Sequence, residues 1–249
     1  MNILLSQLKE MNLDGMHQAL SRLQEMGDAQ ASLSMPVLSR LIAAEAECRR
    51  DRKSQSLAKR ARFRYHASLQ SVATGIDRNL DRSLVDRLAE GRWIKQGQSL
   101  LITGPTGAGK SYLASALGQQ ACRQGFRTLY FNCNKLWYQL RQSRSRDRYE
   151  KEIRTISKAE LLVLDDFGLG KLEASDRLSL LEILEDRWGK SATVVVSQRP
   201  LSSWHEILGE PTVADAICDR LFSNSEKIEL KGDSLRKSPP NLDPNLPPH

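Results

Sequence analysis

Apolar residues in the first part of the chain recur every three or four positions, the spacing of one face of an α-helix. The pattern predicts helices within residues 3–24 and again from Ser34 to Glu47. After His66 the periodicity weakens, and Gly75 lies in the connector that follows. We therefore expect a small helical bundle over residues 1–75. The apolar positions of its first stretch are Leu4, Leu5, Leu8, Met11, Leu13, Met16, Leu20 and Leu23.

The rest of the chain alternates between short apolar runs, typical of buried strands, and longer segments with helical spacing. Strands are predicted at the apolar run that begins at Ser99, and at 127–132, 160–166, 192–197 and 227–230. Helices are predicted at 112–124, 135–156, 178–188, 204–208 and 214–221. Strands separated by helices form a parallel sheet, because right-handed crossovers return each strand in the same direction.

We therefore predict an α/β fold in which helices flank a five-stranded parallel sheet. The sheet domain should cover residues 76–237 and follow the N-terminal helical domain over 1–75. Residues 238–249 are rich in proline and lack apolar periodicity, so we expect a disordered tail there.

A glycine-rich loop that ends in Lys110 and Ser111 follows the first predicted strand. It has the pattern G-x-x-x-x-G-K-[ST] of a phosphate-binding loop, or P-loop, in which backbone N–H groups converge on phosphate oxygens. Lys110 should reach the terminal phosphates of ATP, and the Ser111 hydroxyl should bind Mg²⁺. The predicted ATP-binding residues here are Gly104, Pro105, Thr106, Gly107, Ala108, Gly109, Lys110, Ser111 and Tyr112.

Two carboxylates, Asp165 and Asp166, end a later apolar run. Such a run suits a strand buried on both faces of a parallel sheet, with its acids at the carboxyl edge. Asp165 is expected to hold Mg²⁺ through water, and Asp166 to orient or deprotonate the attacking water. A strand end capped by acids would look the same, but the P-loop favours the catalytic interpretation. Gln198 follows the strand at 192–197 and could touch both the water and the γ-phosphate.

The strand predicted at 127–132 lies in sequence between the P-loop and the two aspartates. This order favours ATPases with an additional strand over simple kinases.

The formal net charge of +7 is concentrated in two segments, Arg49 to Arg64 and Lys135 to Ile156. Basic helices of this kind can follow the phosphates of DNA. A solvated helix face would explain the first segment equally well, because charge runs are commonly solvated. The predicted DNA-binding residues are Arg49, Arg50, Arg52, Lys53, Lys59, Arg60, Arg141, Arg144, Arg146 and Arg148.

The cysteines and the N-terminus indicate a reducing compartment. The four cysteines form no C-x-x-C pair, so we expect neither disulfides nor a structural zinc. Charged residues appear within the first ten positions, and no small-residue cleavage site follows them. No apolar run approaches the length of a membrane span. We expect a cytoplasmic protein with no membrane partner.

Five motifs resemble those of AAA+ ATPases, and within them the IstB-like helper proteins of bacterial insertion sequences, relatives of DnaC-type helicase loaders. They are G-P-T-G-A-G-K-S at 104–111, L-L-V-L-D-D-F-G at 161–168, V-V-S-Q at 195–198, W-H-E-I-L-G-E-P-T-V-A-D-A-I-C-D-R-L at 204–221 and I-E-L-K-G-D-S-L-R-K at 228–237. The last two discriminate best, because many ATPases share the first three.

The resemblance implies roles for three further side chains. Gln198 would sense the γ-phosphate, Arg220 would be the arginine finger that reaches a neighbouring subunit's nucleotide, and Arg236 would be the second sensor arginine. Arginine suits such roles because it is always charged and can bridge phosphate oxygens. A surface ion pair for Arg220 and a simple tail cation for Arg236 remain the alternatives. The resemblance also makes 135–156 an extra helix that faces the inside of an oligomer.

Two features depart from the commoner AAA+ pattern. Asp166 replaces the usual Glu and is one methylene shorter, so hydrolysis should be slow. Only 29 residues follow Arg220, too few for a separate helical lid. Both departures recur in the helicase-loader and IstB-like branch and therefore favour it.

The resemblance predicts an ATPase that helps an insertion-sequence transposase. ATP at the interfaces of a homo-oligomer, ring or spiral, would drive assembly around duplex DNA, and the N-terminal bundle would contact the transposase. The alternative within the superfamily is a replicative helicase loader of the DnaC type, which would bind single-stranded DNA and a helicase. A small-molecule kinase would need an acceptor pocket and a lid, for which the chain after Arg220 is too short. In a further reading, the protein is a nucleotide switch whose hydrolysis only resets assembly.

Overall fold

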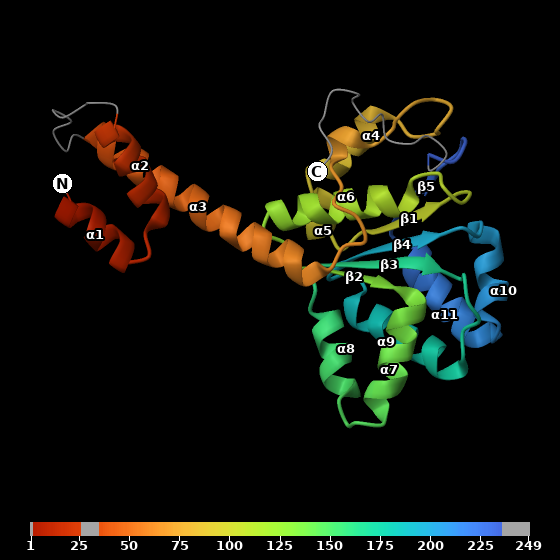
Figure 1. Cartoon of the computed structure of the whole chain (residues 1–249). Helices are drawn as coiled ribbons and strands as arrows, with labels where there is room; N and C mark the ends of the chain where they lie inside the picture. Colours follow the sequence, from red (N-terminus) through yellow and green to blue (C-terminus); the bar gives the residue numbers. More distant parts are fainter. Residues whose placement is uncertain (1, 26–34, 236–249) are drawn as a thin grey trace, which may run out of the picture. The chain divides into compact units, whose positions relative to one another are not determined.

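The computed structural model describes residues 2–25 and 35–235. Contacts divide the chain into two compact units, Met1–Leu57 and Ala58–His249, which we call the N-terminal unit and the sheet unit. Figure 1 shows helices alone in the first and a helix-flanked sheet in the second. The predictions made for Arg236 and for the tail at 238–249 lie outside the described residues.

Three helices build the N-terminal unit: α1 (Asn2–Glu10), α2 (Asp14–Glu25) and α3 (Met35–Ala61), whose last turn belongs to the sheet unit. Leu8, Leu20 and Leu41 form the buried centre of this bundle. The predicted helical periodicity is therefore confirmed, and residues 35–47 and the basic segment as far as Ala61 are parts of one continuous helix.

Gly15 and Glu45 join α2 to α3. A Cβ on Gly15 would lie 2.4 Å from the Ala44 carbonyl oxygen, so glycine allows the two helices to approach closely. The buried Glu45 carboxylate accepts the N–H groups of Gly15 and Met16 at 2.8 and 3.3 Å. Because the first N–H groups of a helix lack partners within it, Glu45 supplies the acceptor that the start of α2 needs.

The sheet unit contains a five-stranded sheet with the order β2-β3-β4-β1-β5, and every adjacent pair is parallel. The strands are β1 (Ser99–Thr103), β2 (Thr128–Asn132), β3 (Leu161–Phe167), β4 (Ala192–Ser197) and β5 (Ser225–Glu229). The predicted fold class and strand number are confirmed. Because β4 lies between β1 and β3, the P-loop strand and the aspartate strand are not neighbours, as an additional strand requires.

Helices cover both faces of this sheet (Figure 1). They are α4 (Arg82–Ala89), α5 (Arg92–Lys95), α6 (Lys110–Arg123), α7 (Cys133–Arg144), α8 (Tyr149–Ser157), α9 (Ala174–Arg187), α10 (Trp204–Leu208) and α11 (Pro211–Phe222). Alternate strand residues enter two separate cores: Leu100 and Ile102 pack with α4, α5 and α6, whereas Leu101 packs with α7 to α11. This two-sided burial explains why the central strands β1, β3 and β4 read as largely apolar runs.

The structure differs from two predicted boundaries. The units divide after Leu57 rather than near residue 75, because Ala67, Leu69 and Val72 pack into the core of the sheet unit. The single helix expected over 135–156 is two helices, because the chain turns at Asp147, whose φ is 51°. We call Cys133–Ser157 the α7–α8 hairpin.

Among the residues that the structure describes, no helix combines the length and the apolar character needed to span a bilayer.

Candidate functional site

The loop between β1 and α6 is a cradle that requires glycine. Gly104, Gly107 and Gly109 have φ angles of 137°, 85° and 92°, a region that other residues rarely adopt. A Cβ on Gly107 would lie 2.1 Å from the Ser234 hydroxyl oxygen, and one on Gly104 would lie 2.2 Å from a carbonyl oxygen of the segment after β5. The backbone therefore curves tightly at the carboxyl edge of the sheet, where an anion can meet the start of α6.

Lys110 and Ser111 open helix α6 and face this edge. The Lys110 ammonium donates a hydrogen bond to the Pro105 carbonyl oxygen at 2.7 Å, across the loop. The Ser111 hydroxyl donates to Asp165 Oδ1 at 2.9 Å. The Asp165 side chain is fully buried at the end of β3. The motif and the aspartate strand, 54 positions apart in sequence, therefore meet in one site.

Hydroxyl and carboxylate oxygens are the ligands that Mg²⁺ prefers, so Ser111 and Asp165 fit a magnesium ion that also binds phosphate. In the described part of the chain, no group of three or more His, Cys, Asp or Glu residues is arranged to hold a metal by itself. A cation at this edge would therefore depend on oxygens from a bound phosphate as well as on these two side chains.

Asp166 lies beside Asp165 in an unusual backbone conformation. Its φ is 59°, and the pairing of β3 with β4 shifts register between Leu164 and Phe167. The Asp166 N–H donates to Asp165 Oδ1 at 2.9 Å, and the Asn132 side-chain amide donates to Asp166 Oδ2 at 2.8 Å. Residues with positive φ persist where their surroundings hold them, and these bonds supply that restraint.

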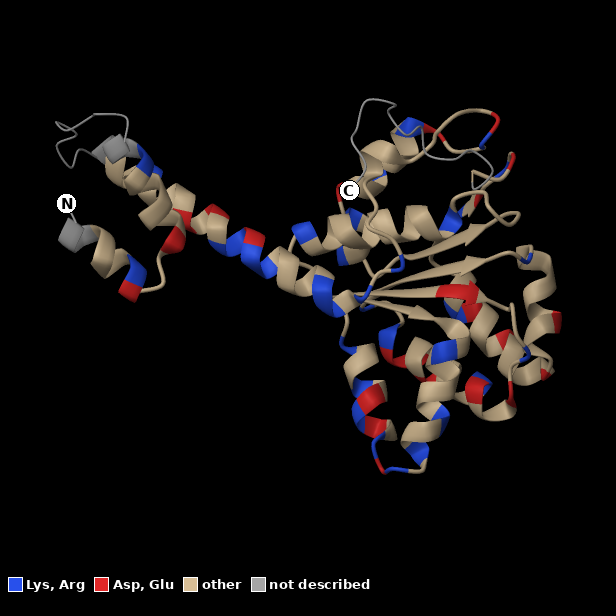
Figure 2. Ribbon diagram, in the orientation of Figure 1, with Lys and Arg blue, Asp and Glu red and all other residues tan. Residues whose placement is uncertain are grey.

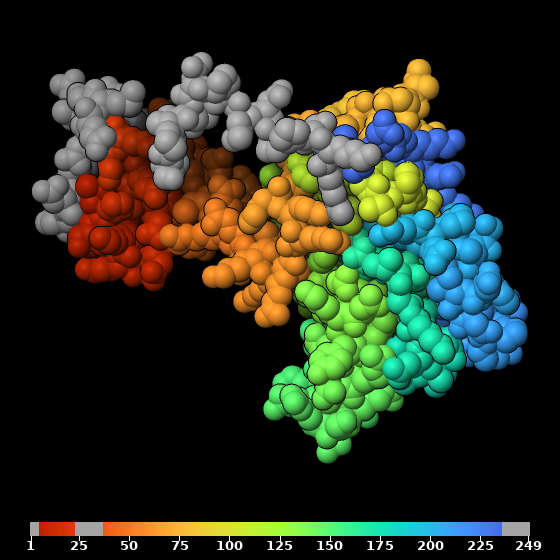
Figure 3. Space-filling model, turned by 45° about the vertical axis from the view of Figure 1, so that its right-hand side comes forward, coloured from red at the N-terminus to blue at the C-terminus, as the bar shows by residue number. Residues whose placement is uncertain are grey.

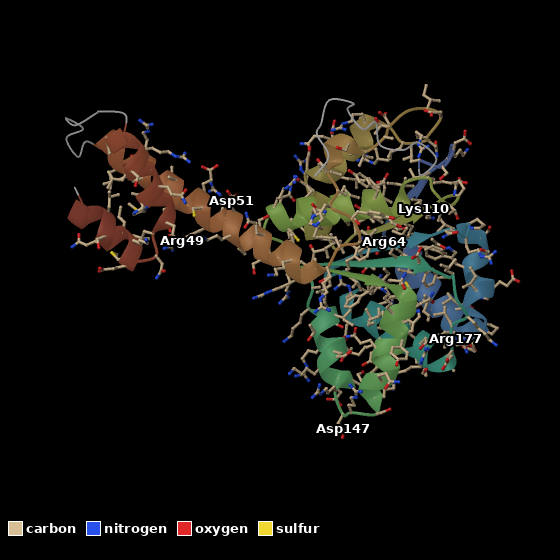
Figure 4. All side chains as sticks on the ribbon, in the orientation of Figure 1. Arg49, Asp51, Arg64, Lys110, Asp147 and Arg177 are labelled. Atoms are coloured by element: carbon tan, nitrogen blue, oxygen red, sulfur yellow. The ribbon has the colours of Figure 1, made fainter. Side chains whose placement is uncertain are left out.

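Arg64 and Tyr130 also reach the carboxylates. Arg64 Nη1 lies 2.9 Å from Asp166 Oδ2 and 3.4 Å from Asp165 Oδ2. Arg64 and the P-loop residue Lys110 are labelled in Figure 4. The Tyr130 hydroxyl donates to Asp165 Oδ2. Burial, and then the charge of Asp165, raise the pKa of Tyr130 above its ordinary value, so its proton stays available for this bond.

Gln198 closes the other side of the site. Its side-chain oxygen accepts a hydrogen bond from the Thr106 hydroxyl at 2.6 Å, which joins the end of β4 to the P-loop. A cavity of about 180 Å³ lies between these groups, lined by Tyr65, Lys110, Tyr112, Asp166, Gln198 and others. A second cavity of about 500 Å³ adjoins the loop and is lined mainly by apolar side chains, Val72, Leu80, Leu113 and Leu230 among them.

The segment after β5 is fastened to the P-loop by Arg78. This buried guanidinium donates to the Ala108 carbonyl at 2.8 Å and to the Asp233 carbonyl at 2.9 Å. The Leu235 N–H donates to the Gly107 carbonyl at 3.0 Å. The chain therefore rests on the loop just before Arg236, the predicted second sensor, which itself lies outside the described residues.

Arg220 lies away from the other predicted site residues. It borders a small cavity with Ser99, the first residue of β1, and Thr193, the second residue of β4. Arg220 therefore lies at the amino edge of the sheet. Its guanidinium pairs with Glu185 at 3.0 Å and lies 4.7 Å from the centre of the Trp188 ring. Within one chain, Arg220 therefore contacts none of the groups at the P-loop; a role at a nucleotide would require a second subunit.

The predicted DNA-binding arginines of the α7–α8 hairpin differ in their contacts. Arg141 Nη1 lies 2.7 and 2.6 Å from the two oxygens of the buried Asp176, and Arg144 lies 3.7 Å from the centre of the Tyr149 ring. Arg146 and Arg148 are exposed where α7 and α8 join. Figure 2 shows basic residues at this turn, and Figure 3 shows the hairpin, in green, as an exposed projection of the sheet unit.

Two predicted DNA-binding residues of α3 form ion pairs. Arg49 pairs with Glu45 at 2.7 Å, and Arg52 pairs with Asp14 within the N-terminal unit. All six predicted residues on this helix are exposed, these two and also Arg50, Lys53, Lys59 and Arg60.

The sequence interpretation missed Arg64, Arg78, Tyr130 and Asn132 as site residues. Asn132 was within reach of the same reasoning as the aspartates, because it ends a predicted strand and pairs in register with Asp165. Tyr130, two residues earlier, lies on the same face of β2 as Asn132. Arg64 and Arg78 carried no comparable signal, because both lie outside the sheet and only the packed fold brings them to the site.

Comparison with known proteins supplies the family. The family model described as IstB-like ATP binding protein matches residues 6–241. An insertion sequence ATP-binding protein of Sinorhizobium fredii is 42% identical over 234 residues, which cover 94% of this chain and 96% of that protein. The ATP-binding protein of insertion sequence IS1162 from Pseudomonas fluorescens is 40% identical over 201 residues, covering 80% of this chain and 87% of that protein.

Two solved structures show a similar fold. The DnaC helicase loader aligns with a TM-score of 0.55 and 20% identity over 67% of this chain and 98% of that chain. DnaI aligns with a TM-score of 0.59 and 22% identity over 71% of this chain and 94% of that chain. At these identities the likeness is one of fold.

Proposed function

Since the chain belongs to the IstB-like ATP-binding proteins, we propose that it is a Mg²⁺-dependent ATPase that binds duplex DNA and helps the transposase of its insertion sequence. The observation that carries the ATPase part is the meeting of Lys110, Ser111, Asp165 and Asp166 at one edge of the sheet. These are the groups that phosphoryl transfer to water needs: a cation on the phosphates, oxygens for a metal and a carboxylate near the attacking water.

In this proposal Lys110 exchanges its bond to the Pro105 carbonyl for the terminal phosphates, and Ser111 and Asp165 hold the metal. Mg²⁺, when bound, would neutralise the charge that develops on the phosphate oxygens. Asp166 would take the water's proton, and its restrained backbone would keep the carboxylate aimed at that water. Gln198 would sense the γ-phosphate from the end of β4, where it already contacts the loop.

The adenine base would occupy the apolar cavity beside the loop. Val72, Leu80, Leu113 and Leu230 give that cavity apolar walls against which the faces of a flat aromatic ring can pack. Tyr112 lines both cavities, so it would lie where the base meets the phosphates. Arg236 stays a candidate for a further phosphate contact, because the residue before it lies on the loop.

ATP would act between subunits of a homo-oligomer. Arg220, at the opposite edge of the sheet from its own P-loop, would reach the nucleotide of a neighbouring subunit. The exposed arginines of the α7–α8 hairpin and the exposed basic residues of α3 would bind DNA phosphates, and the N-terminal unit would contact the transposase. ATP and DNA place this work in the cytoplasm.

A replicative helicase loader is the second candidate, favoured by the fold shared with DnaC and DnaI. The relatives that match nearly the full chain are insertion sequence proteins, and they support the transposition assignment. The two functions differ in DNA strandedness, which an assembly experiment can measure.

Nucleotide binding and hydrolysis test the ATPase part. A fluorescent ATP analogue should bind the wild-type protein in Mg²⁺ and phosphate should be released. Lys110→Ala should lose binding by about 100-fold or more, because the cation on the terminal phosphates is removed. Lys171→Ala, at an exposed position, removes the same charge and should bind normally. Equal binding by both variants would contradict the proposal.

A further inference from the structure

The residues that follow helix α3 are fixed against the nucleotide site at three consecutive positions. The Phe63 ring lies 6.0 Å from the Tyr130 ring, and it occupies space that a side chain at Gly118 would fill, since a Cβ there would be 2.3 Å away. The Tyr65 carbonyl accepts a hydrogen bond from the Gln119 side chain at 2.7 Å. Arg64, between them, is therefore presented to the carboxyl edge by its two anchored neighbours.

The Arg64 guanidinium lies beside two carboxylates. Asp165 and Asp166 are adjacent carboxylates, and the first is fully buried. Two neighbouring carboxylates repel one another unless a cation is close, and burial strengthens that repulsion. Arg64 contacts the Oδ2 atoms of both, at 3.4 and 2.9 Å, and so balances this charge.

The other oxygen of Asp165, Oδ1, accepts the Ser111 hydroxyl. Asp165 Oδ1 and the Ser111 hydroxyl oxygen are the two ligands assigned to Mg²⁺ above, so Arg64 and the metal would share the Asp165 carboxylate. Arg64 and Mg²⁺ would repel each other at that distance in a partly buried site. The Arg64 side chain is 40% exposed, so its guanidinium is already partly hydrated and gains further hydration when it moves into water.

We propose that Arg64 is a built-in counter-ion of the Asp165–Asp166 pair, and that Mg²⁺ arriving with ATP displaces it. Arg64 is then a positioning residue that sets how much Mg²⁺ the site needs. This inference rests on the proposed ATP site. Arg64 lies three residues beyond Ala61, the last residue of α3, so the exchange of cations ties the end of that helix to the nucleotide state.

Equilibrium binding of a fluorescent ATP analogue to the full chain tests the inference, measured in EDTA and over a Mg²⁺ titration. In Arg64→Gln the Mg²⁺ concentration for half-maximal enhancement of binding should fall about fivefold or more, because the competing charge is gone. Affinity in EDTA should fall by less than about fivefold, because Arg64 balances the carboxylates near the phosphates but does not itself bind the phosphates in this account. Arg64→Lys keeps the charge and should stay close to the wild type.

Arg62→Gln is the matched control. Arg62 lies two positions before Arg64, is exposed and forms no ion pair with either aspartate, and its substitution removes the same charge. Its Mg²⁺ requirement should equal that of the wild type. An unchanged Mg²⁺ requirement in Arg64→Gln would overturn the inference. A loss of ATP affinity in EDTA greater than about fivefold would overturn it too, since Arg64 would then be a direct phosphate ligand. A wild-type protein that binds no ATP would overturn the proposed function as well, which separates the two failures.

Discussion

Two parts of the sheet unit carry dense charge, and they hold it in different ways. At the carboxyl edge, Asp165 accepts hydrogen bonds from Ser111, Tyr130 and the Asp166 N–H. Asp166 accepts hydrogen bonds from Asn132 and Arg64, and its backbone is restrained. In the α7–α8 hairpin, Arg141 is bound to the buried Asp176, whereas Arg146 and Arg148 are exposed to solvent.

The difference shows what each kind of sequence signal can predict. A motif with fixed spacing implies one backbone geometry, so its side chains arrive at a site together. A count of basic residues indicates only that a polyanion could bind, because some of these residues stabilise the fold and others are free to contact a ligand. The predictions below test this distinction, beginning with the largest expected effect.

Removing the charge of Asp166 should affect chemistry alone. Asp166→Asn should lower ATP hydrolysis by about 100-fold or more, because the group that takes the water's proton is lost. ATP affinity should change little, since Lys110 binds the phosphates in this account and Asp166 acts on the attacking water. Phosphate release and equilibrium binding measure the two effects. Asp186→Asn, an exposed aspartate on α9, is the control and should hydrolyse normally.

Arg141 should prove structural although it belongs to a basic segment. Arg141→Gln should lower the free energy of unfolding by about 2 kcal/mol, because Asp176 would stay buried without its cation. Urea unfolding measures the change. Arg146→Gln, on the same hairpin, should leave the midpoint unchanged; a similar loss of stability in both variants would break the distinction drawn above.

The P-loop should be sensitive to a single methyl group. Gly107→Ala should lower ATP affinity by about tenfold, because its Cβ would collide with Ser234 and distort the cradle. Gly189→Ala is the matched control: its φ of 66° imposes similar backbone strain, but no atom lies within 4 Å of the added Cβ. Both variants should lose some stability, and only the first should lose affinity in a nucleotide titration.

The exposed arginines should give the smallest effect and one without base specificity. Arg146→Gln combined with Arg148→Gln should weaken duplex DNA binding about fivefold at moderate salt and reduce the salt slope by about two, one for each phosphate contact. Fluorescence anisotropy over a salt series measures both quantities. Lys95→Gln combined with Lys190→Gln removes equal charge from other exposed positions and should bind DNA like the wild type. Equal losses in the two double variants would mean that net charge alone governs binding.

Much of the fold and the centre of the site could be predicted from sequence, for a physical reason. Strands buried on both faces must be apolar along their whole length, and a tight phosphate cradle must use glycine, so both leave clear patterns. Asp165 and Asp166 were found because strand ends gather at one edge. The break at Asp147 and the arrival of Arg64 depend on how loops pack, and no periodicity records that.

The domain boundary illustrates the same limit. The residues from His66 to Gly75 have weak periodicity, yet Leu69 and Val72 are buried in the sheet unit's core. An irregular segment can be firmly packed, because its apolar residues need only fit the surface they meet. A fading helical pattern therefore marks the end of an element more reliably than the end of a domain.

The most direct test of the central claim is assembly on DNA. The purified protein would be mixed with a duplex of 60 base pairs and imaged by electron microscopy, with ATP, ADP or no nucleotide, and with single-stranded DNA of equal length as the comparison. A DNA-binding ATPase of transposition should form defined assemblies on the duplex with ATP, and these should dissolve with ADP. Assembly on single strands alone, or equal assembly with ATP and ADP, would contradict the account.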